Sequence, residues 1–387
     1  MQAATHQGIL KSQPVEIHLE FGNSFAGLGW GDFRKARSGE FVFCTAMTGL
    51  EESLTDPSFA HQVVVSTVAH VGNTGFTNED AESSKVWAEG LICRHLEALP
   101  SNWRSKMNVA QWLCGENRFV VEGVDTREFT TVLREQGSQR GIVVPAGFFK
   151  EARQARSYID SHVAKMDGLN LTELVSCKES YNFSEARGEV PTIAVWDFGV
   201  KTNTLRTLAK LGAKVVVMPA TSSAEDLLRV GRDGILLSNG PGDPAAATHI
   251  VAELKKILGR RRVFAICLGH QLVALAAGLK TYKMKFGHRG IHHPVVELDS
   301  SGKALRTWIT SQNHGFAVDA QKLAADIQVS FVHADDGSVE GLSLANQLCR
   351  TVQFHPEAAP GPTDAAGLLS KFYEEVAADL RYRKTTS

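Results

Sequence analysis

Short apolar runs alternate with amphipathic stretches along the second half of the chain. From Pro191 onward, each of the runs TIAVWD, AKVVVMP, GILL and VFAI is followed by residues with helical spacing. Continuous apolar runs separated by helices are typical of strands buried on both faces of a parallel sheet. We therefore expect a domain over residues 191–387 with a mostly parallel sheet flanked by helices, and functional groups beyond the carboxyl ends of its strands.

The first part of the chain has a different pattern, with short β-branched or aromatic runs closed by Gly, Asn or Asp. Examples are GEFVFCTAMTG, HQVVVSTVAHVGNTG and RFVVEGVD, which predict strands. One helix is expected over 125–137, with Asp125 and Gly137 as its boundary residues. We predict a smaller, β-rich α+β domain over residues 1–150 and a polar linker region over 151–190.

Composition excludes several classes of protein. The 41 Lys and Arg residues balance 42 Asp and Glu, for a net charge of -1, so no global field favours nucleic acid or an anionic membrane. The sequence contains no long apolar run, no signal-peptide pattern at its N-terminus and no C-x-x-C pair among its six cysteines. A cytoplasmic protein with reduced thiols is expected, with neither a disulfide framework nor a zinc ribbon.

Cys267 stands between the apolar run VFAI and a helical stretch, GHQLVALAAG. A buried cysteine is most often a small hydrophobic residue. The strand-to-helix position resembles a nucleophile elbow, with AICLG in place of G-x-S-x-G and a tight turn expected at Leu268 and Gly269. At a helix N-terminus the dipole and the free N–H groups would favour thiolate.

Two further stretches supply the partners that a nucleophile needs. In TVQFHPEAAPGP, His355 and Glu357 are two residues apart, so both side chains fall on one side of an extended chain. The carboxylate can then orient the imidazole as a general base. The rigid SNGPGDP loop, Ser238 to Pro244, can bring backbone N–H groups to an oxyanion together with Leu268. Alone, each has an ordinary alternative: a surface loop for HPE, a strand-to-helix turn for SNGPGDP. Their combination in one domain favours a catalytic cysteine.

Other motifs are set aside. WDFGVK contains D-F-G, but neither a kinase catalytic loop nor a phosphate-binding glycine loop accompanies it. The histidines of FGHRGIHHP, namely His288, His292 and His293, lie among residues that break a helix, and no carboxylate lies within the run. We expect a loop near the site and no metal.

The motifs GPGDP, ICLGHQ, QNHGFAV and FHPEAAPGP resemble those of the class I glutamine amidotransferases. KMKFGHRGIHHPV is similar to the small, glutaminase subunit of carbamoyl phosphate synthetase. The first domain resembles that subunit too, through TAMTGLEESLTDPSFAHQVVV, HVGNTG and GVDTREFTTVLREQGSQRG. The resemblance covers nearly the whole chain.

The resemblance implies a Cys267, His355 and Glu357 triad that hydrolyses glutamine through a thioester. It implies an oxyanion hole from the amides of Gly240 and Leu268. The other glutamine-binding positions that it implies are Ala46, Gly242, Gln271, Asn313, Gly315 and Phe316. It also implies a separate large subunit that receives the ammonia and makes carbamoyl phosphate from bicarbonate and ATP, for pyrimidines and arginine. No cofactor is expected in this chain, since ATP and Mg²⁺ would bind the large subunit.

Two positions depart from the family pattern. Ala46 stands where relatives commonly carry a serine whose hydroxyl belongs to the glutamine site, and Ala265 stands at the usual first glycine of the elbow. Ala46 therefore leaves open a weakly active or silent partner-binding subunit. An amidotransferase of another synthetase is a second alternative, which the first domain disfavours. Lys201 is either near the glutamine pocket or a solvated lysine at a helix start.

Overall fold

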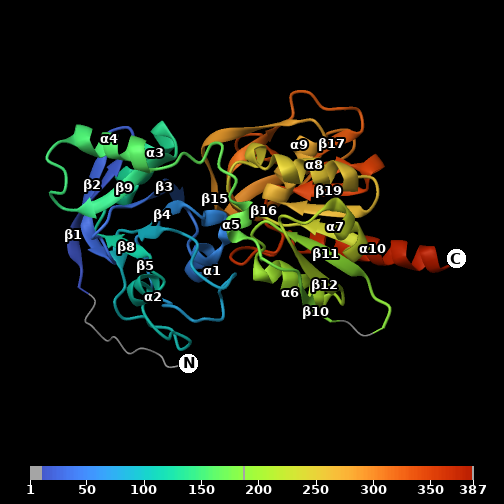
Figure 1. Ribbon diagram of the computed structural model, residues 1–387, viewed down its shortest axis with the longest axis horizontal. Coiled ribbons are helices and arrows are strands. Elements are labelled where there is room, and N and C mark those ends of the chain that lie inside the picture. Colours follow the sequence, from blue (N-terminus) through green and yellow to red (C-terminus); the bar gives the residue numbers. More distant parts are fainter. Residues whose placement is uncertain (1–10, 186–187, 386–387) are drawn as a thin grey trace. The chain divides into compact units, whose positions relative to one another are not determined.

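The computed structural model of the protein describes residues 11–185 and 188–385 (Figure 1). The N-terminal stretch, in which the sequence predicts no signal peptide, therefore lies partly outside the described residues. Contacts divide the chain into two compact units that interleave in sequence. The first consists of the chain up to Cys44, His61–Glu79 and Ala88–Ala164; the second consists of Thr45–Ala60, Asp80–Trp87 and the chain from Lys165 onward.

The first unit is built on a closed barrel in the strand order β1-β2-β8-β6-β4-β3-β9. Alternate residues of its first strand, Val15, Ile17 and Leu19, are buried in the barrel core, as the period of a strand requires. The strands are β1 (Gln13–Leu19), β2 (Ser24–Trp30), β3 (Arg37–Cys44), β4 (Gln62–Ser66), β6 (Gly90–Ile92), β8 (Phe119–Glu122) and β9 (Gln139–Pro145). A small sheet pairs β5 (His70–Val71) with β7 (His95–Leu96).

Helices complete this unit: α2 (Val109–Gly115), α3 (Thr126–Gln136) and α4 (Ala152–His162). The helix expected over 125–137 is confirmed, because the Asp125 side chain accepts hydrogen bonds from the N–H groups of Arg127 and Glu128 and Gly137 ends the helix. Phe129 and Leu133 of α3 are buried in the barrel core.

The stretch expected to be a linker, 151–190, contains two helices and a strand in its described residues. In α4, Ala155 and Ile159 pack against Ile142 and Val144 of β9, so this part belongs to the first unit. The remainder belongs to the second unit and contains α5 (Thr172–Val175) and β10 (Tyr181–Ser184). Polar composition concealed these elements, because their outer faces are exposed and only a few positions pack inward.

The second unit contains a 10-stranded sheet in the order β10-β12-β11-β13-β14-β19-β18-β16-β15-β17. Its parallel strands are β11 (Thr192–Asp197), β12 (Lys214–Pro219), β13 (Gly234–Leu237), β14 (Arg262–Ile266) and β19 (Cys349–Val352). The antiparallel strands are β10, β15 (Lys280–Leu298), β16 (Ala304–Asp319), β17 (Ile327–His333) and β18 (Val339–Leu344). The expected parallel arrangement therefore describes half of the sheet. The rest is antiparallel, and it includes the hairpin of β15 and β16, which needs only a short connection.

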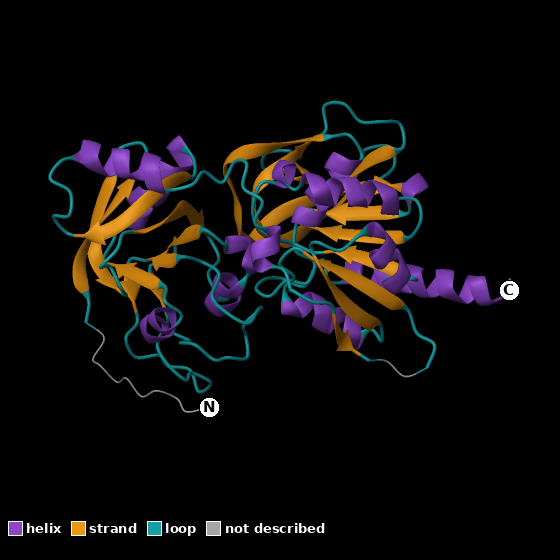
Figure 2. Ribbon diagram, in the orientation of Figure 1, coloured by secondary structure: helices purple, strands orange, loops and turns teal. Residues whose placement is uncertain are grey.

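Helices cover both faces of the parallel strands (Figures 1 and 2). The residues of β11 alternate: Ala194 and Trp196 pack in one core cluster, and Ile193 and Val195 in the other. The first cluster includes residues of α7 (Ala224–Val230), α8 (Thr248–Ile257) and α9 (Leu268–Ala276); the second includes residues of α6 (Thr202–Lys210) and α10 (Gly367–Thr385). Strands buried on both faces explain why these segments are apolar throughout.

Short elements from the first half of the sequence complete the second unit: α1 (Leu50–Thr55) and the 3-10 turn η1 (Pro57–Phe59). Two more 3-10 turns, η2 (Pro244–Ala246) and η3 (Ala345–Gln347), follow β13 and β18. Nowhere in 11–185 or 188–385 is a helix both long and apolar enough to cross a membrane. The cytoplasmic location expected from the sequence stays a prediction.

Candidate active site

Cys267 lies between β14 and α9, at the carboxyl edge of the parallel strands. Its backbone has φ 52° and ψ −104°, and its N–H donates to the Val352 carbonyl at 2.8 Å. A positive φ is strained for a residue with a Cβ, and such strain is typical of a nucleophile elbow. The tight turn was expected at Leu268 and Gly269, but both lie in the first turn of α9, and Cys267 itself makes the turn.

The Cys267 thiol is enclosed by protein, with only 2% of the residue exposed. Its Sγ lies 3.6 Å from the carbonyl oxygen of Asn313, on β16. The N-terminus of α9 lies directly behind the sulfur, because Cys267 is the residue that precedes the helix.

His355 and Glu357 follow β19 and are both buried. His355 Nδ1 lies 2.7 Å from Glu357 Oε1, and the His355 N–H donates to the Ser311 carbonyl at 2.9 Å. Burial lowers the pKa of His355, but Glu357 and the Cys267 side chain raise it more, to about 10. These opposing effects favour an imidazolium next to the sulfur, with Glu357 holding the ring on its other side.

Lys201, just before α6, is buried and ion-paired. Its Nζ lies 3.2 Å from Glu357 Oε1, and it also donates to the Ala358 carbonyl. Burial raises the pKa of Glu357, but Lys201 and then His355 lower it more, to about 2. The alternative that Lys201 is a solvated lysine is therefore wrong. Lys201, Glu357, His355 and Cys267 form a row of interacting side chains.

The loop after β13 packs tightly against the start of α9. A Cβ on Gly240 would lie 2.1 Å from the carbonyl oxygen of Phe198 and 3.0 Å from Leu268 Cδ2. Gly242 has φ 97°, where a side chain would meet the Leu169 carbonyl. Leu268 opens α9, so its N–H has no acceptor within the helix. In the described chain no backbone carbonyl accepts the N–H of Gly240 or Leu268.

The other glutamine-binding positions implied by the sequence lie in the same unit. Gln271 of α9 donates from Nε2 to the Phe316 carbonyl at 2.8 Å, which ties α9 to β16. Asn313 and Gly315 precede Phe316 on β16, and Asn313 supplies the carbonyl next to the thiol. Ala46 is half-buried in the Thr45–Ala60 segment of this unit.

Sequence reasoning missed two acidic residues from the first half of the chain. Asp56 accepts hydrogen bonds from Asn313 Nδ2 at 2.9 Å and Asn239 Nδ2 at 3.2 Å. Glu82 accepts from the Asn203 N–H at 2.8 Å, and burial is the main cause that raises its pKa to about 7. Asp56 can be recognised in the sequence as a cap before Pro57. No local pattern indicates that it reaches residues so distant in sequence.

Family comparisons agree with this arrangement. The model of glutamine amidotransferase class I matches residues 194–375, and that of the carbamoyl-phosphate synthase small chain, CPSase domain, matches residues 17–143. The first match contains the nucleophile elbow and the His355–Glu357 pair, and defines the second unit as an amidotransferase of class I.

Whole-chain relatives extend the match. The carbamoyl phosphate synthase small chain of Haemophilus ducreyi is 41% identical, over 94% of this chain and 98% of that protein. That of Neisseria meningitidis serogroup B is 42% identical, over 96% and 100%. That of Pseudomonas syringae pv. tomato is 41% identical, over 95% and 99%. The chain thus belongs to the carbamoyl phosphate synthase small chain family.

Proposed function

We propose that this chain is the glutaminase subunit of a carbamoyl phosphate synthase, and that it hydrolyses glutamine at Cys267. The observation that carries the proposal is the buried His355–Glu357 pair beside a cysteine at the start of α9. Family membership supports the same activity.

In the first step, Cys267 Sγ attacks the side-chain carbonyl carbon of glutamine. His355 transfers a proton to the leaving nitrogen, the carbon–nitrogen bond breaks, and ammonia departs from a γ-glutamyl thioester. In the second step, water loses a proton to His355 and attacks the thioester. The carbon–sulfur bond then breaks, and glutamate and the cysteine are regenerated.

Each step places negative charge on the carbonyl oxygen of the substrate. The N–H groups of Gly240 and Leu268 would bind it, because no backbone carbonyl of the described chain accepts either group and the two residues are adjacent. Gly242, Gln271, Asn313, Gly315 and Phe316 would hold the amino-acid part of glutamine, with Ala46 at the edge of that site. Glu357 and Lys201 would keep the imidazole oriented.

The ammonia would pass to a separate large subunit. That partner would bind ATP and Mg²⁺ and make carbamoyl phosphate from bicarbonate, for the synthesis of pyrimidines and arginine. This chain would then need no cofactor for glutamine hydrolysis, because the Cys267 and His355 chemistry is complete without one.

The test measures glutamate release from glutamine by the wild type and Cys267→Ser, each alone and with a large subunit. Release that requires Cys267 and rises with the partner is the expected result. Release that persists in Cys267→Ser would remove the cysteine from the mechanism.

A silent partner-binding subunit is the second candidate, because Ala46 lacks a hydroxyl at a position that the family uses for glutamine. One lost hydrogen bond to a charged group weakens binding by about 1.5–3 kcal/mol. Complex formation with the large subunit, without glutamate release at any glutamine concentration, would establish this second function. Recovery of a different ATP-dependent synthetase as the partner would instead point to an amidotransferase of that enzyme.

A further inference from the structure

A group of buried polar side chains lies next to the strand segment that carries Asn313, and the triad does not use it. His288 on β15 is paired in register with His314 on β16, and Glu340 lies on β18. The exposed fractions of these residues are 6%, 5% and 0%, respectively. Charged and titratable groups so deeply buried need partners, and the partners here are incomplete.

Three atoms of this group that could act as metal ligands lie close together. His288 Nδ1 lies 3.7 Å and His314 Nε2 lies 3.8 Å from Glu340 Oε1, and all three atoms are within 4.8 Å of one another. Of these, His288 Nδ1 and Glu340 Oε1 have no hydrogen-bond partner in the described chain. These two buried atoms therefore lie at ion-pair distance from one another, across a gap too long for a hydrogen bond.

The third atom, His314 Nε2, faces an acceptor. His314 Nδ1 lies 2.8 Å from the Phe316 carbonyl, which can only accept, so the Nδ1 atom carries the hydrogen. The lone pair of Nε2 then faces Gln312 Oε1 at 2.9 Å. The Gln312 amide cannot be turned to relieve this contact without loss, because its Nε2 donates to Glu340 Oε2 at 2.8 Å. In this orientation of the Gln312 amide, a second proton on the ring or a cation removes the contact between two acceptors.

The outer contacts match those of a metal site. His288 donates from Nε2 to Asp336 Oδ2 at 3.1 Å, and His314 donates to a backbone carbonyl. Histidine ligands commonly give their second N–H to a carboxylate or a carbonyl, which fixes the ring with its other nitrogen toward the metal.

We propose that His288 Nδ1, His314 Nε2 and Glu340 Oε1 bind a divalent transition-metal ion, with Zn²⁺ as the best match. Tetrahedral Zn²⁺ with N and O ligands at about 2.0–2.2 Å places those ligands about 3.3–3.5 Å apart. The separations of 3.7 and 3.8 Å between Glu340 Oε1 and the two histidine nitrogens need to shorten by only a few tenths of an ångström. Gln312 Oε1, beside His314 Nε2, supplies a fourth oxygen.

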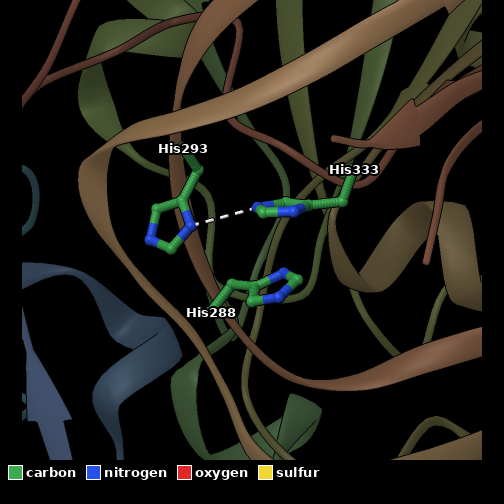
Figure 3. A group of neighbouring side chains, drawn as sticks. All are labelled: His288, His293 and His333. Atoms are coloured by element: carbon green, nitrogen blue, oxygen red, sulfur yellow. Dashed lines mark hydrogen bonds between the residues drawn. The ribbon is translucent and has the colours of Figure 1, made fainter. Parts of the chain in front are cut away.

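A second group, His288, His293 and His333, is less suitable (Figure 3). The rings of His288 and His333 are stacked, with centroids 4.1 Å apart and planes 24° apart, so their in-plane lone pairs do not converge. His333 Nδ1 also accepts the Asp335 N–H, which leaves the hydrogen on Nε2 for the bond of 3.2 Å to His293. His293 and His333 are therefore hydrogen-bonded to one another, although His293 Nε2 has no hydrogen-bond partner in the described chain.

The sequence predicts a loop around His288 with no carboxylate in it, and therefore no metal site. The structure places His288 and His293 in β15, and the carboxylate comes from β18. An ion at this site would join β15, β16 and β18 on the side of Asn313 and Phe316. The proposal stands whether or not the chain hydrolyses glutamine.

The test is Zn²⁺ and Co²⁺ binding by the full chain after removal of metal with a chelator. All proteins carry Cys267→Ala, so that the active-site thiol cannot bind the ion. Calorimetry should find one Zn²⁺ per chain, and Co²⁺ should give the visible bands of a four-coordinate N/O site. Glu340→Gln keeps the shape of the side chain and should weaken Zn²⁺ binding at least tenfold.

Two control variants locate the site. His292→Asn changes an exposed neighbour, and His293→Asn changes the second group; both should bind Zn²⁺ within twofold of the parent. The Co²⁺ spectrum of the parent tests the ligand set even if Glu340→Gln does not fold. Absence of Zn²⁺ and Co²⁺ binding to the parent, equal affinity in Glu340→Gln, or loss of binding in His293→Asn would each overturn the proposal.

Discussion

Replacement of Lys201 by methionine tests the buried charges behind the triad. The lysine side chain is 2% exposed and that of Glu357 is 0% exposed, with 3.2 Å between Nζ and Oε1. At an effective dielectric constant of about 20, this attraction is about 5 kcal/mol. Methionine matches the length of the side chain but leaves Glu357 without its cation. We expect Lys201→Met to lower the free energy of unfolding by about 3–5 kcal/mol.

Urea unfolding followed by tryptophan fluorescence measures this loss, since Trp196 is buried in the same unit. Lys214→Met is the matched control, because Lys214 pairs with Glu185 at the surface and should lose less than about 1 kcal/mol. The double variant, Lys201→Met with Glu357→Gln, should lose about 1–3 kcal/mol less free energy of unfolding than the two single variants lose together. Additive losses, or a loss in Lys201→Met no larger than in the control, would refute the reasoning.

Three further variants test other features of the site. Gly240→Ala places a Cβ against the Phe198 carbonyl and should displace the Gly240 N–H from the oxyanion hole, which should lower kcat about 100-fold or more. The control Gly367→Ala, which has open space around its Cβ, should leave kcat unchanged. Glu82 has its pKa raised from 4.5 to about 7, so the folded state binds the extra proton and stability falls as pH rises through that window. Urea unfolding at several pH values should show that Glu82→Gln removes this fall in the free energy of unfolding, which is up to about 3 kcal/mol. An unchanged dependence on pH in Glu82→Gln would contradict the prediction. Ala46→Ser should lower the KM for glutamine about tenfold or more, and an unchanged KM would exclude that hydroxyl from the site.

Local patterns predicted the elements that depend on residues close in sequence. The Asp125 cap and Gly137 define the ends of α3, and the apolar runs from Pro191 onward became β11, β12, β13 and β14. The same holds for the His355–Glu357 pair, since two residues along an extended chain are enough to bring these groups together. Each of these features follows from backbone periodicity or capping.

Long-range features were missed for a corresponding reason. Asp56 bonds Asn313 across most of the chain, and Glu82 caps the start of α6 from a segment that interrupts the first unit. Neither segment has a sequence pattern that identifies its distant partner. The sequence predicts a linker over 151–190 because a helix with one narrow buried face, such as α4, has mostly polar residues.

The sequence alone determined the alternation of strands and helices, the cysteine at the elbow and the histidine–glutamate pair, because hydrophobic periodicity and short spacing act within a few residues. Tertiary structure decided which charges share the buried site. It alone brought Lys201 to Glu357 and set Glu340 between His288 and His314. Burial and pairing of charges depend on which strands become neighbours, and that is settled only when the whole sheet has formed.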